Sequence, residues 1–141
     1  MKGIITLCGS TKFKEQFEEV NRRLTWSDWI VLSVGSFHHS EKDHDIAGEI
    51  IARKVKLDGL HKEKIAMSQA VVIINQDNYV GESTISELAF ARSLGKPIYW
   101  LHFHEYTYTP FDKDSSHWIN ATDDKDWSEL LDERPNDLQP K

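Results

Sequence analysis

The chain has 141 residues, with 23 acidic and 17 basic side chains and a formal net charge of −6. This length suits a single domain with its own hydrophobic core. The acidic balance argues against an extended surface for DNA or RNA, so we expect any bound phosphate to belong to a small ligand. No stretch is long and apolar enough to span a bilayer, and Met1 leads into a strand pattern instead of a signal peptide. These features predict a cytoplasmic protein with no nucleic-acid or membrane partner.

Cys8 is the only cysteine, which predicts no internal disulfide and no cysteine-based zinc site. No base lies near it in the sequence, which favours a small buried apolar role over a nucleophilic one. The histidines that could be metal ligands are His38, His39, His44, His102 and His104. Two histidines two apart on a strand share a face, but a metal needs at least a third ligand. We therefore expect no metal and no cofactor, and interpret the segment at His38 and His39 as a pocket lid.

Segments with strand and helix periodicity alternate along most of the chain. The predicted strands are Gly3–Cys8, Trp29–Val34, Ala70–Asn75 and Ile98–Phe103. The predicted helices are Thr11–Leu24, Glu49–Met67 and Leu88–Leu94. Gly59 could interrupt the second helix, and Gly95-Lys96-Pro97 stops the third. The polar segment Ser36–Gly48 is interpreted as a loop over the site.

Apolar strands that alternate with helices indicate a mostly parallel sheet covered on both faces. We predict an α/β fold of the flavodoxin-like or Rossmann-like type, with four to five strands and helices on both sides of the sheet. In the strand order 2-1-3-4, ligands bind at the switch point between the first and third strands, outside their carboxyl ends. Residues 1–104 are predicted to form this domain. Residues 105–141 are predicted to be a C-terminal extension packed on it, with an amphipathic segment at 126–131 and a frayed end at 134–141.

Two loops rich in small residues follow the first and third predicted strands: Gly9-Ser10-Thr11-Lys12 and Gly81-Glu82-Ser83-Thr84. Because each opens a helix, backbone amides and the helix dipole favour a phosphate or carboxylate in the crevice between them. The substrate-binding residues predicted on this basis are Gly9, Ser10, Thr11, Lys12, Gly81, Ser83 and Thr84. The first loop lacks the glycine spacing of a P-loop or of a dinucleotide-binding motif. Ordinary helix capping is the alternative role for Ser10 and Thr11.

Glu87 lies at the junction between the third predicted strand and the helix after it, where the functional sites of α/β proteins are commonly found. On that helix Glu87 shares a face with Phe90, Ala91 and Leu94, so a carboxylate heads an otherwise apolar stripe. Such a carboxylate must be capped, paired or functional. The competing interpretation is a capping box, Thr84-x-x-Glu87, in which the glutamate folds back onto the N-cap amide.

A resemblance to a known family is carried by the order and spacing of four segments. They are Leu7-Cys8-Gly9-Ser10-Thr11-Lys12, Val31-Leu32-Ser33, Asp58-Gly59-Leu60-His61-Lys62-Glu63, and Gly81–Glu87 followed by Leu88-Ala89-Phe90-Ala91 and Leu94-Gly95-Lys96-Pro97-Ile98. Together they resemble the nucleoside 2-deoxyribosyltransferase superfamily, and in particular its branch of nucleoside 5'-monophosphate N-glycoside hydrolases. The resemblance covers the predicted α/β domain and not the extension.

The resemblance implies that Glu87 is the nucleophile, which attacks the anomeric carbon of the sugar and gives a glycosyl-enzyme intermediate. It also implies an aspartate, on the helix before the third strand, that protonates the departing base. His61 is nearest to that position and Asp58 lies one turn earlier, so both are candidates; each could instead be an ordinary helix residue. Lys12 takes the place of an arginine in the family's 5'-phosphate loop. Gln69 takes the place of an aspartate that often precedes the third strand.

The predicted function is therefore hydrolysis, or transfer, at the N-glycosidic bond of a nucleoside 5'-monophosphate or deoxynucleotide. The partner is a small-molecule nucleotide or nucleoside, and a homodimer or other homo-oligomer is expected because dimerisation is common in the resembled superfamily. Tyr79 could stack on the base or be an ordinary exposed loop residue. One alternative is a non-catalytic nucleotide-binding or sensing module of the same fold. A less favoured one is a phosphotransferase that depends on Lys12.

Overall fold

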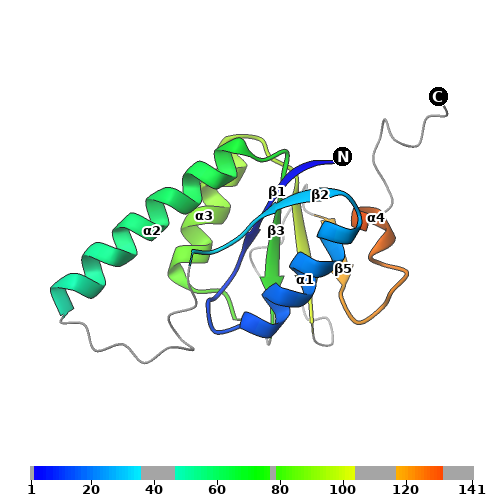
Figure 1. The fold of residues 1–141 in the computed structure, drawn as a ribbon, viewed down its shortest axis with the longest axis horizontal. Coiled ribbons are helices and arrows are strands. Elements are labelled where there is room, and N and C mark those ends of the chain that lie inside the picture. Colours follow the sequence, from blue (N-terminus) through cyan, green and yellow to red (C-terminus); the bar gives the residue numbers. More distant parts are fainter. Residues whose placement is uncertain (1, 36–46, 77–78, 104–116, 132–141) are drawn as a thin grey trace.

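The computed structural model describes residues 2–35, 47–76, 79–103 and 117–131, in which strands and helices alternate (Figure 1). The strands are β1 (Gly3–Cys8), β2 (Trp29–Leu32), β3 (Ala70–Asn75), β4 (Ile98–His102) and β5 (His117–Asn120). The helices are α1 (Lys14–Trp26), α2 (Ala47–Met67), α3 (Glu82–Ser93) and α4 (Ser128–Leu131). Among the described residues, no helix combines the length and the hydropathy that a membrane span needs.

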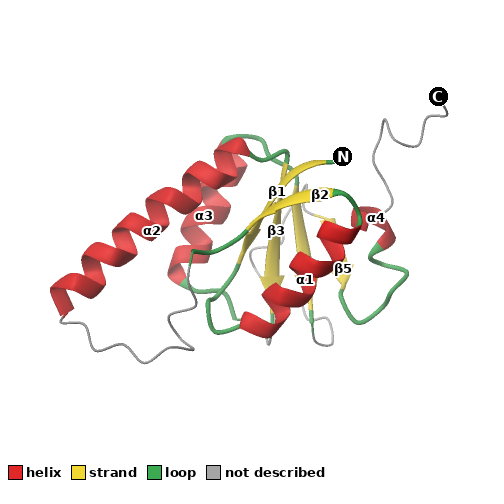
Figure 2. Ribbon diagram, in the orientation of Figure 1, coloured by secondary structure: helices red, strands yellow, loops and turns green. Residues whose placement is uncertain are grey.

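In the described part of the chain, the strands, which are yellow in Figure 2, form one sheet. Their order is β2-β1-β3-β4-β5, and every neighbouring pair is parallel. β1 lies between β2 and β3, so that Ile5 pairs with Val31 on one side and with Ala70 on the other. The predicted α/β class, the parallel sheet and the strand order 2-1-3-4 are confirmed. β5 adds a fifth strand in a segment that the sequence pattern does not mark, because His117–Asn120 lacks the apolar run of the central strands.

Successive side chains of each strand point to opposite faces of the sheet, and each face has its own hydrophobic core. α1 and α4 cover one face, where Phe17, Val20 and Leu24 of α1 pack at helical spacing. α2 and α3 cover the other face, where Ile65 and Leu88 pack. β3 is buried along its whole length because it is central and covered on both sides.

Helix α3 ends as the sequence predicts. Gly95 has a left-handed φ of +70°, which a glycine adopts without strain. The Lys96 N–H donates to the Ala91 carbonyl (3.1 Å) and the Gly95 N–H donates to the Arg92 carbonyl (3.0 Å), the two bonds of a Schellman motif. Pro97 cannot continue a helix, so the chain turns directly into β4.

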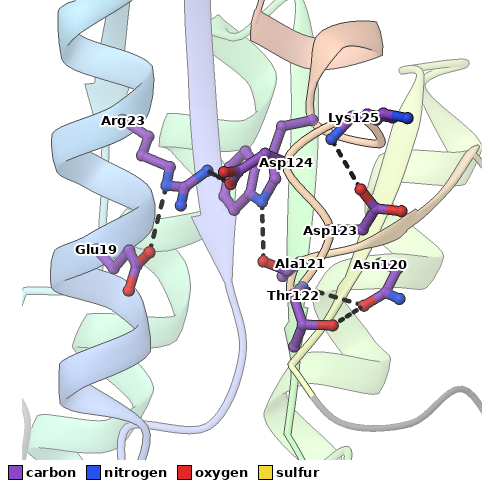
Figure 3. Close-up of polar contacts among 9 residues, drawn as sticks. Glu19, Arg23, Asn120, Ala121, Thr122, Asp123, Asp124 and Lys125 are labelled. Carbon is purple, nitrogen blue, oxygen red and sulfur yellow. Dashed lines mark hydrogen bonds and ion pairs between the residues drawn. The ribbon is translucent and has the colours of Figure 1, made fainter.

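The segment after β5 is attached to the rest of the fold by polar contacts (Figure 3). Arg23 of α1 pairs with Glu19 on its own helix and with Asp124 after β5, each at 3.2 Å. The buried Trp127 donates its indole N–H to the Ala121 carbonyl (3.0 Å) and packs in the core beneath α1. Further bonds within this turn join Asn120 to Thr122 and Asp123 to Lys125. Residues 117–131 therefore pack on the sheet and on α1.

All three predicted helices differ from their predicted extent, and α3 begins at Glu82 instead of Leu88. α1 begins at Lys14 instead of Thr11, because the chain first makes a turn in which the Ser10 carbonyl accepts the Phe13 N–H (3.0 Å). α2 runs through Gly59 without a break. A single glycine costs a helix only about 1 kcal/mol relative to alanine, which the packing of a long helix can offset.

Some predictions concern residues outside the described part of the chain. They are the loop histidines, the second member of the His-x-His pair and the frayed end: His38, His39, His44, His104 and 134–141. The lid interpretation and the frayed end therefore stay predictions, as do the expected homo-oligomer and the cytoplasmic location.

Candidate active site

A cavity of about 540 Å³ lies at the carboxyl ends of β1 and β3, the predicted switch point. Its walls come from the loop after β1, the segment after β2, helix α2 and the start of α3. The lining residues are Gly9, Ser10, Thr11, Val34, Gly35, Arg53, Lys54, Leu57, Asp58, His61, Tyr79, Gly81, Glu82, Ser83, Thr84 and Glu87. Every site residue predicted from the sequence is among them except Lys12. A concave site of this size suits a small organic ligand.

Gly9 lets the loop after β1 pass close to the sheet. Its φ is +150°, and a Cβ there would lie 3.0 Å from the Ile74 carbonyl oxygen and 3.3 Å from the Phe17 ring. The Ser10 hydroxyl accepts the Lys12 N–H (3.3 Å), so this side chain shapes the loop. The alternative role of Ser10 and Thr11 as helix caps is wrong, because α1 has Phe13 at its N-cap and no side-chain cap bond.

Glu87 lies in the second turn of α3, because that helix begins at Glu82 with Gly81 at its N-cap and no side-chain cap bond. The capping-box interpretation is therefore wrong: Thr84 is already inside the helix and Glu87 is too far along it to reach the N-cap amide. The side chain of Glu87 is buried and borders the cavity. Leu94, predicted to share its face, is exposed instead, because it is the C-cap beyond the last turn.

Cys8 and His61 lie beside Glu87. The Cys8 Sγ is 3.4 Å from His61 Nε2, and the same nitrogen is 3.8 Å from Glu87 Oε1. All three side chains are buried, although they come from β1, α2 and α3. The predicted burial of Cys8 is confirmed, but its apolar role is wrong, because β1 brings the thiol into contact with two ionisable groups.

Burial controls the ionisation of this cluster. It raises the pKa of the Glu87 carboxyl from 4.5 to about 8; the charge of Asp58 adds to the rise, and a hydrogen bond from Cys8 opposes it. Burial also lowers the pKa of His61 from 6.5 to about 4, with a further lowering by the positive charge of Lys64. Desolvation, followed by the charge of Glu87, raises the pKa of the Cys8 thiol well above its usual range. At neutral pH the cluster is therefore largely a thiol, a neutral imidazole and a carboxyl group.

The two candidate acids occupy different places. Asp58 is half-buried and lines the cavity one helical turn before His61. His61 is only 4% exposed and is in contact with Cys8 and Glu87. The structure therefore places Asp58 at the wall and His61 against the buried carboxyl group.

Two basic residues of α2, Arg53 and Lys54, line the cavity although the sequence analysis does not predict them. They lie one helical turn before Leu57 and Asp58, so spacing along a helix face from Asp58 is the signal that could have found them. They bring positive charge to a cavity in an acidic chain. Tyr79 also lines the cavity, as the base-stacking prediction requires.

Lys12 and Gln69, two of the departures from the resembled family, fall in different places. The Lys12 ammonium lies 3.7 Å from the centre of the Tyr79 ring, a cation–π contact that joins the loops after β1 and β3. Gln69 lies at the start of β3, where its Oε1 accepts the Ile4 N–H (2.6 Å). Gln69 therefore joins the starts of two strands and does not line the cavity.

No protein-family model matches the chain, and no curated protein matches its sequence. Solved structures do match. A 2-deoxyribosyltransferase from Bacillus psychrosaccharolyticus has a TM-score of 0.72 at 18% identity, over 98% of this chain and 97% of that chain. The Clostridium botulinum CMP N-glycosidase BcmB has a TM-score of 0.57 at 19% identity, over 92% of this chain and 98% of that chain. A 2-deoxyribosyltransferase from Leishmania mexicana has a TM-score of 0.51 at 16% identity, over 72% and 65% of the two chains.

These likenesses establish the class of fold: the chain has the α/β fold of the 2-deoxyribosyltransferases. The same fold occurs in an N-glycosidase, so the resemblance predicted from the sequence is confirmed, at the level of the fold, for both branches. The roles of individual side chains depend on the geometry of the site.

Proposed function

We propose that the protein is an enzyme that cleaves the N-glycosidic bond of a nucleoside 5'-monophosphate or deoxynucleotide, with Glu87 as its nucleophile. The observation that carries the proposal is the position of Glu87, a buried carboxyl group that borders the cavity at the switch point. The helix does not need this side chain as a cap. A buried ionisable group in a cleft, with a raised pKa and a charged partner, is typical of a catalytic group.

In the proposed reaction the Glu87 carboxylate attacks the anomeric carbon of the sugar. A carbon–oxygen bond forms, and the carbon–nitrogen bond breaks with its electron pair passing to the base. Asp58 donates the proton that the base nitrogen takes up. Water then hydrolyses the glycosyl-enzyme ester to free sugar phosphate, or a second base takes the place of water and makes the reaction a transfer.

The protonation of Glu87 fits this division of roles. Glu87 must be ionised to attack, whereas its raised pKa keeps it protonated when the cavity is empty. The negative charge of Asp58 contributes to that rise and so helps Glu87 to keep its proton. Transfer of this proton to Asp58 generates the nucleophile and the acid together. The neutral His61 positions the Glu87 carboxyl group without adding a charge.

We assign the 5'-phosphate to the small-residue loops. The first N–H groups of α3 have no intrahelical acceptor, and this turn borders the cavity together with the loop at Gly9. Arg53 and Lys54 add positive charge from α2. Tyr79 offers an aromatic face on which a base can stack.

The first experiment is a chromatographic assay of free-base release from ribo- and deoxyribonucleosides and their 5'-monophosphates. The matched control is Glu63→Ala, because Glu63 is an exposed glutamate of α2 that does not line the cavity. We expect release by the wild type and by Glu63→Ala, faster from monophosphates than from nucleosides. Glu87→Ala should reduce release by at least about 1000-fold. Unchanged release by a folded Glu87→Ala variant, or no release from any nucleotide with or without an acceptor base, would overturn the proposal.

A second experiment separates the two candidate acids. Asp58→Asn should lower base release from natural nucleotides by about 10²–10⁴-fold. The same variant should be nearly normal on a 4-nitrophenyl glycoside 5-phosphate, because 4-nitrophenolate leaves without a proton. His61→Gln should slow both substrates alike, since it disturbs the nucleophile. Rescue of His61→Gln, and not of Asp58→Asn, by the activated substrate would reverse the assignment.

The alternative function is a non-catalytic nucleotide-binding module. The protonated state of Glu87 in the empty cavity favours it, since a neutral carboxyl group is a poor nucleophile. A binding module would show thermal stabilisation by one nucleotide, unchanged affinity in Glu87→Gln and no turnover. Base release by the wild type excludes this alternative.

A further inference from the structure

Cys8, His61 and Glu87 form a cluster of three different metal-binding groups: a thiol, an imidazole and a carboxyl group. Each offers one ligand atom, and these atoms all lie within 4.8 Å of one another. The three side chains are buried, and they come from β1, α2 and α3. The proposed reaction uses Glu87 and His61 but gives no task to Cys8, which is in contact with both.

We propose that the Cys8 Sγ, the His61 Nε2 and the Glu87 carboxylate bind one Zn²⁺ ion. Zinc lies about 2.3 Å from a thiolate sulfur and about 2.0–2.2 Å from nitrogen or oxygen ligands, so the ligand atoms of a tetrahedral site are roughly 3.3–3.6 Å apart. Here the sulfur–nitrogen distance is 3.4 Å and the nitrogen–oxygen distance is 3.8 Å. The third distance, from the Cys8 sulfur to the Glu87 carboxylate, is at most 4.8 Å, so a movement of the Glu87 side chain toward the other two ligands completes the site.

The proposed site borders the cavity through two of its three ligands. His61 and Glu87 line the cavity, whereas Cys8 lies behind them and does not. Water or a ligand in the cavity can therefore complete the coordination, as in zinc sites with three protein ligands. Binding displaces the thiol proton of Cys8 and the proton that Glu87 holds. The resulting thiolate and carboxylate neutralise the two positive charges of the ion, and the imidazole donates a lone pair.

The sequence does not predict this site, because it uses a single cysteine and because its ligands are far apart in the chain. Zinc sites built from several cysteines have a recognisable spacing in the sequence, and this cluster has none. The parallel topology brings β1 beside β3, and α2 and α3 then contribute one ligand each over the same face.

Bound zinc would hold the Glu87 carboxylate and prevent its attack on a sugar. This consequence rests on the proposed function, whereas zinc binding itself does not. We expect zinc to inhibit base release in proportion to its occupancy, and a chelator to restore it.

The binding test uses the full chain, freed of metal with EDTA and titrated with Co²⁺ as a spectroscopic substitute for Zn²⁺. Because Cys8 is the only cysteine, a thiolate-to-cobalt charge-transfer band identifies it without ambiguity. We expect this band in the wild type with one ion per chain, its loss on addition of excess Zn²⁺, and its absence in Cys8→Ser. His61→Ala and Glu87→Gln should weaken Zn²⁺ binding by at least about tenfold. His117→Ala, which removes a histidine of β5, should bind like the wild type.

Absence of the charge-transfer band in the wild type would overturn the metal site even if Cys8→Ser fails to fold. Equal Zn²⁺ affinity of the wild type and a folded Cys8→Ser variant would overturn it as well. Base release measured with Zn²⁺ and with EDTA separates the two proposals. A cobalt band without base release in either condition rejects the proposed function and keeps the site. Base release without a band rejects the site and keeps the function, and faster release with Zn²⁺ rejects inhibition.

Discussion

The two faces of the sheet differ in what they bury. Among the described residues, the buried strand side chains that point toward α1 and α4 are apolar, whereas polar side chains interrupt the core beneath α2 and α3. β1 shows the contrast within one strand. Ile5 and Leu7 belong to the first core, but Thr6 bonds to the Lys64 carbonyl of α2 and Cys8 contacts His61.

On the face covered by α2 and α3, the buried polar groups also differ along the strands: those near the middle are structural, and those at the carboxyl ends border the site. Near the middle of β1, the hydroxyl groups of Thr6 and Ser68 lie within hydrogen-bond distance of each other and of the Lys64 carbonyl, so each buried hydroxyl has a partner and is explained by structure. At the carboxyl end, His61 and Glu87 border a cavity and have strongly shifted pKa values. A buried polar group on this face is therefore a candidate for function only at the carboxyl end of the strands.

The largest expected effect comes from Glu87→Gln, which keeps the shape of the side chain and removes its charge. We expect base release to fall by at least about 1000-fold. The melting temperature at pH 8 should stay the same or rise, because glutamine removes the burial penalty of an ionised carboxylate. Base release and thermal denaturation on one preparation would check both. A loss of stability as large as that of a core substitution would mean that Glu87 is structural.

The opposite pattern is expected on the other face. Leu24 of α1 is fully buried in the core between this helix and the sheet. Leu24→Ala should therefore lower the free energy of unfolding by about 2–5 kcal/mol and leave kcat/KM of the folded protein unchanged. Urea denaturation and the base-release assay measure these quantities. The matched control is Leu94→Ala at an exposed position, which should change stability little. A large change in kcat/KM for Leu24→Ala would show that the two faces are coupled.

Much of the fold could be predicted because the central strands are strongly apolar. Ala70–Asn75 is buried on both faces, and its uninterrupted run marks a central parallel strand in the sequence. β5 could not be predicted in this way, because it lies at the edge and its residues His117–Asn120 are mixed in polarity. The start of α3 at Glu82 was also not predicted, because Ser83 and Thr84 have weak helix propensity and are typical of a loop.

The site could be predicted in outline, since sequence pattern locates the carboxyl ends of parallel strands and these ends meet at one place. Glu87, Asp58 and the loop at Gly9 all border the cavity. What the pattern could not give is contact between distant segments. The 3.4 Å approach of Cys8 to His61 depends on how α2 crosses β1, which no local spacing encodes.

A smaller effect should appear in the pH dependence of stability of the metal-free protein. The pKa of Glu87 is raised from 4.5 to about 8, so the folded state keeps a proton that the unfolded chain releases, and stability falls as pH rises through this interval. The pKa of His61 is lowered from 6.5 to about 4, so its contribution to stability rises with pH up to 6.5. Between pH 6.5 and 8 only the Glu87 effect remains within this cluster.

In that window the wild type should lose up to about 2 kcal/mol of stability that Glu87→Gln does not lose. Urea denaturation of both proteins at several pH values provides the measurement. Parallel curves of stability against pH for the two proteins between pH 6.5 and 8 would show that Glu87 is already ionised at pH 6.5. Glu87 would then have no proton to transfer to Asp58 in the proposed reaction.

The smallest effect tests the coupling of the two carboxyl groups. Asp58→Asn removes a negative charge that helps to raise the pKa of Glu87, so Glu87 should ionise at lower pH in this variant. Desolvation is the larger cause and persists, so the pKa should stay above 4.5. The fall in stability between pH 6.5 and 8 should therefore shrink without vanishing. Glu63→Gln, which removes an exposed carboxylate from the same helix, should leave that fall unchanged. An equal effect of both substitutions would point to the general charge of α2 instead of a specific interaction between Asp58 and Glu87. The assignment of Asp58 as the group that receives the Glu87 proton would then be rejected.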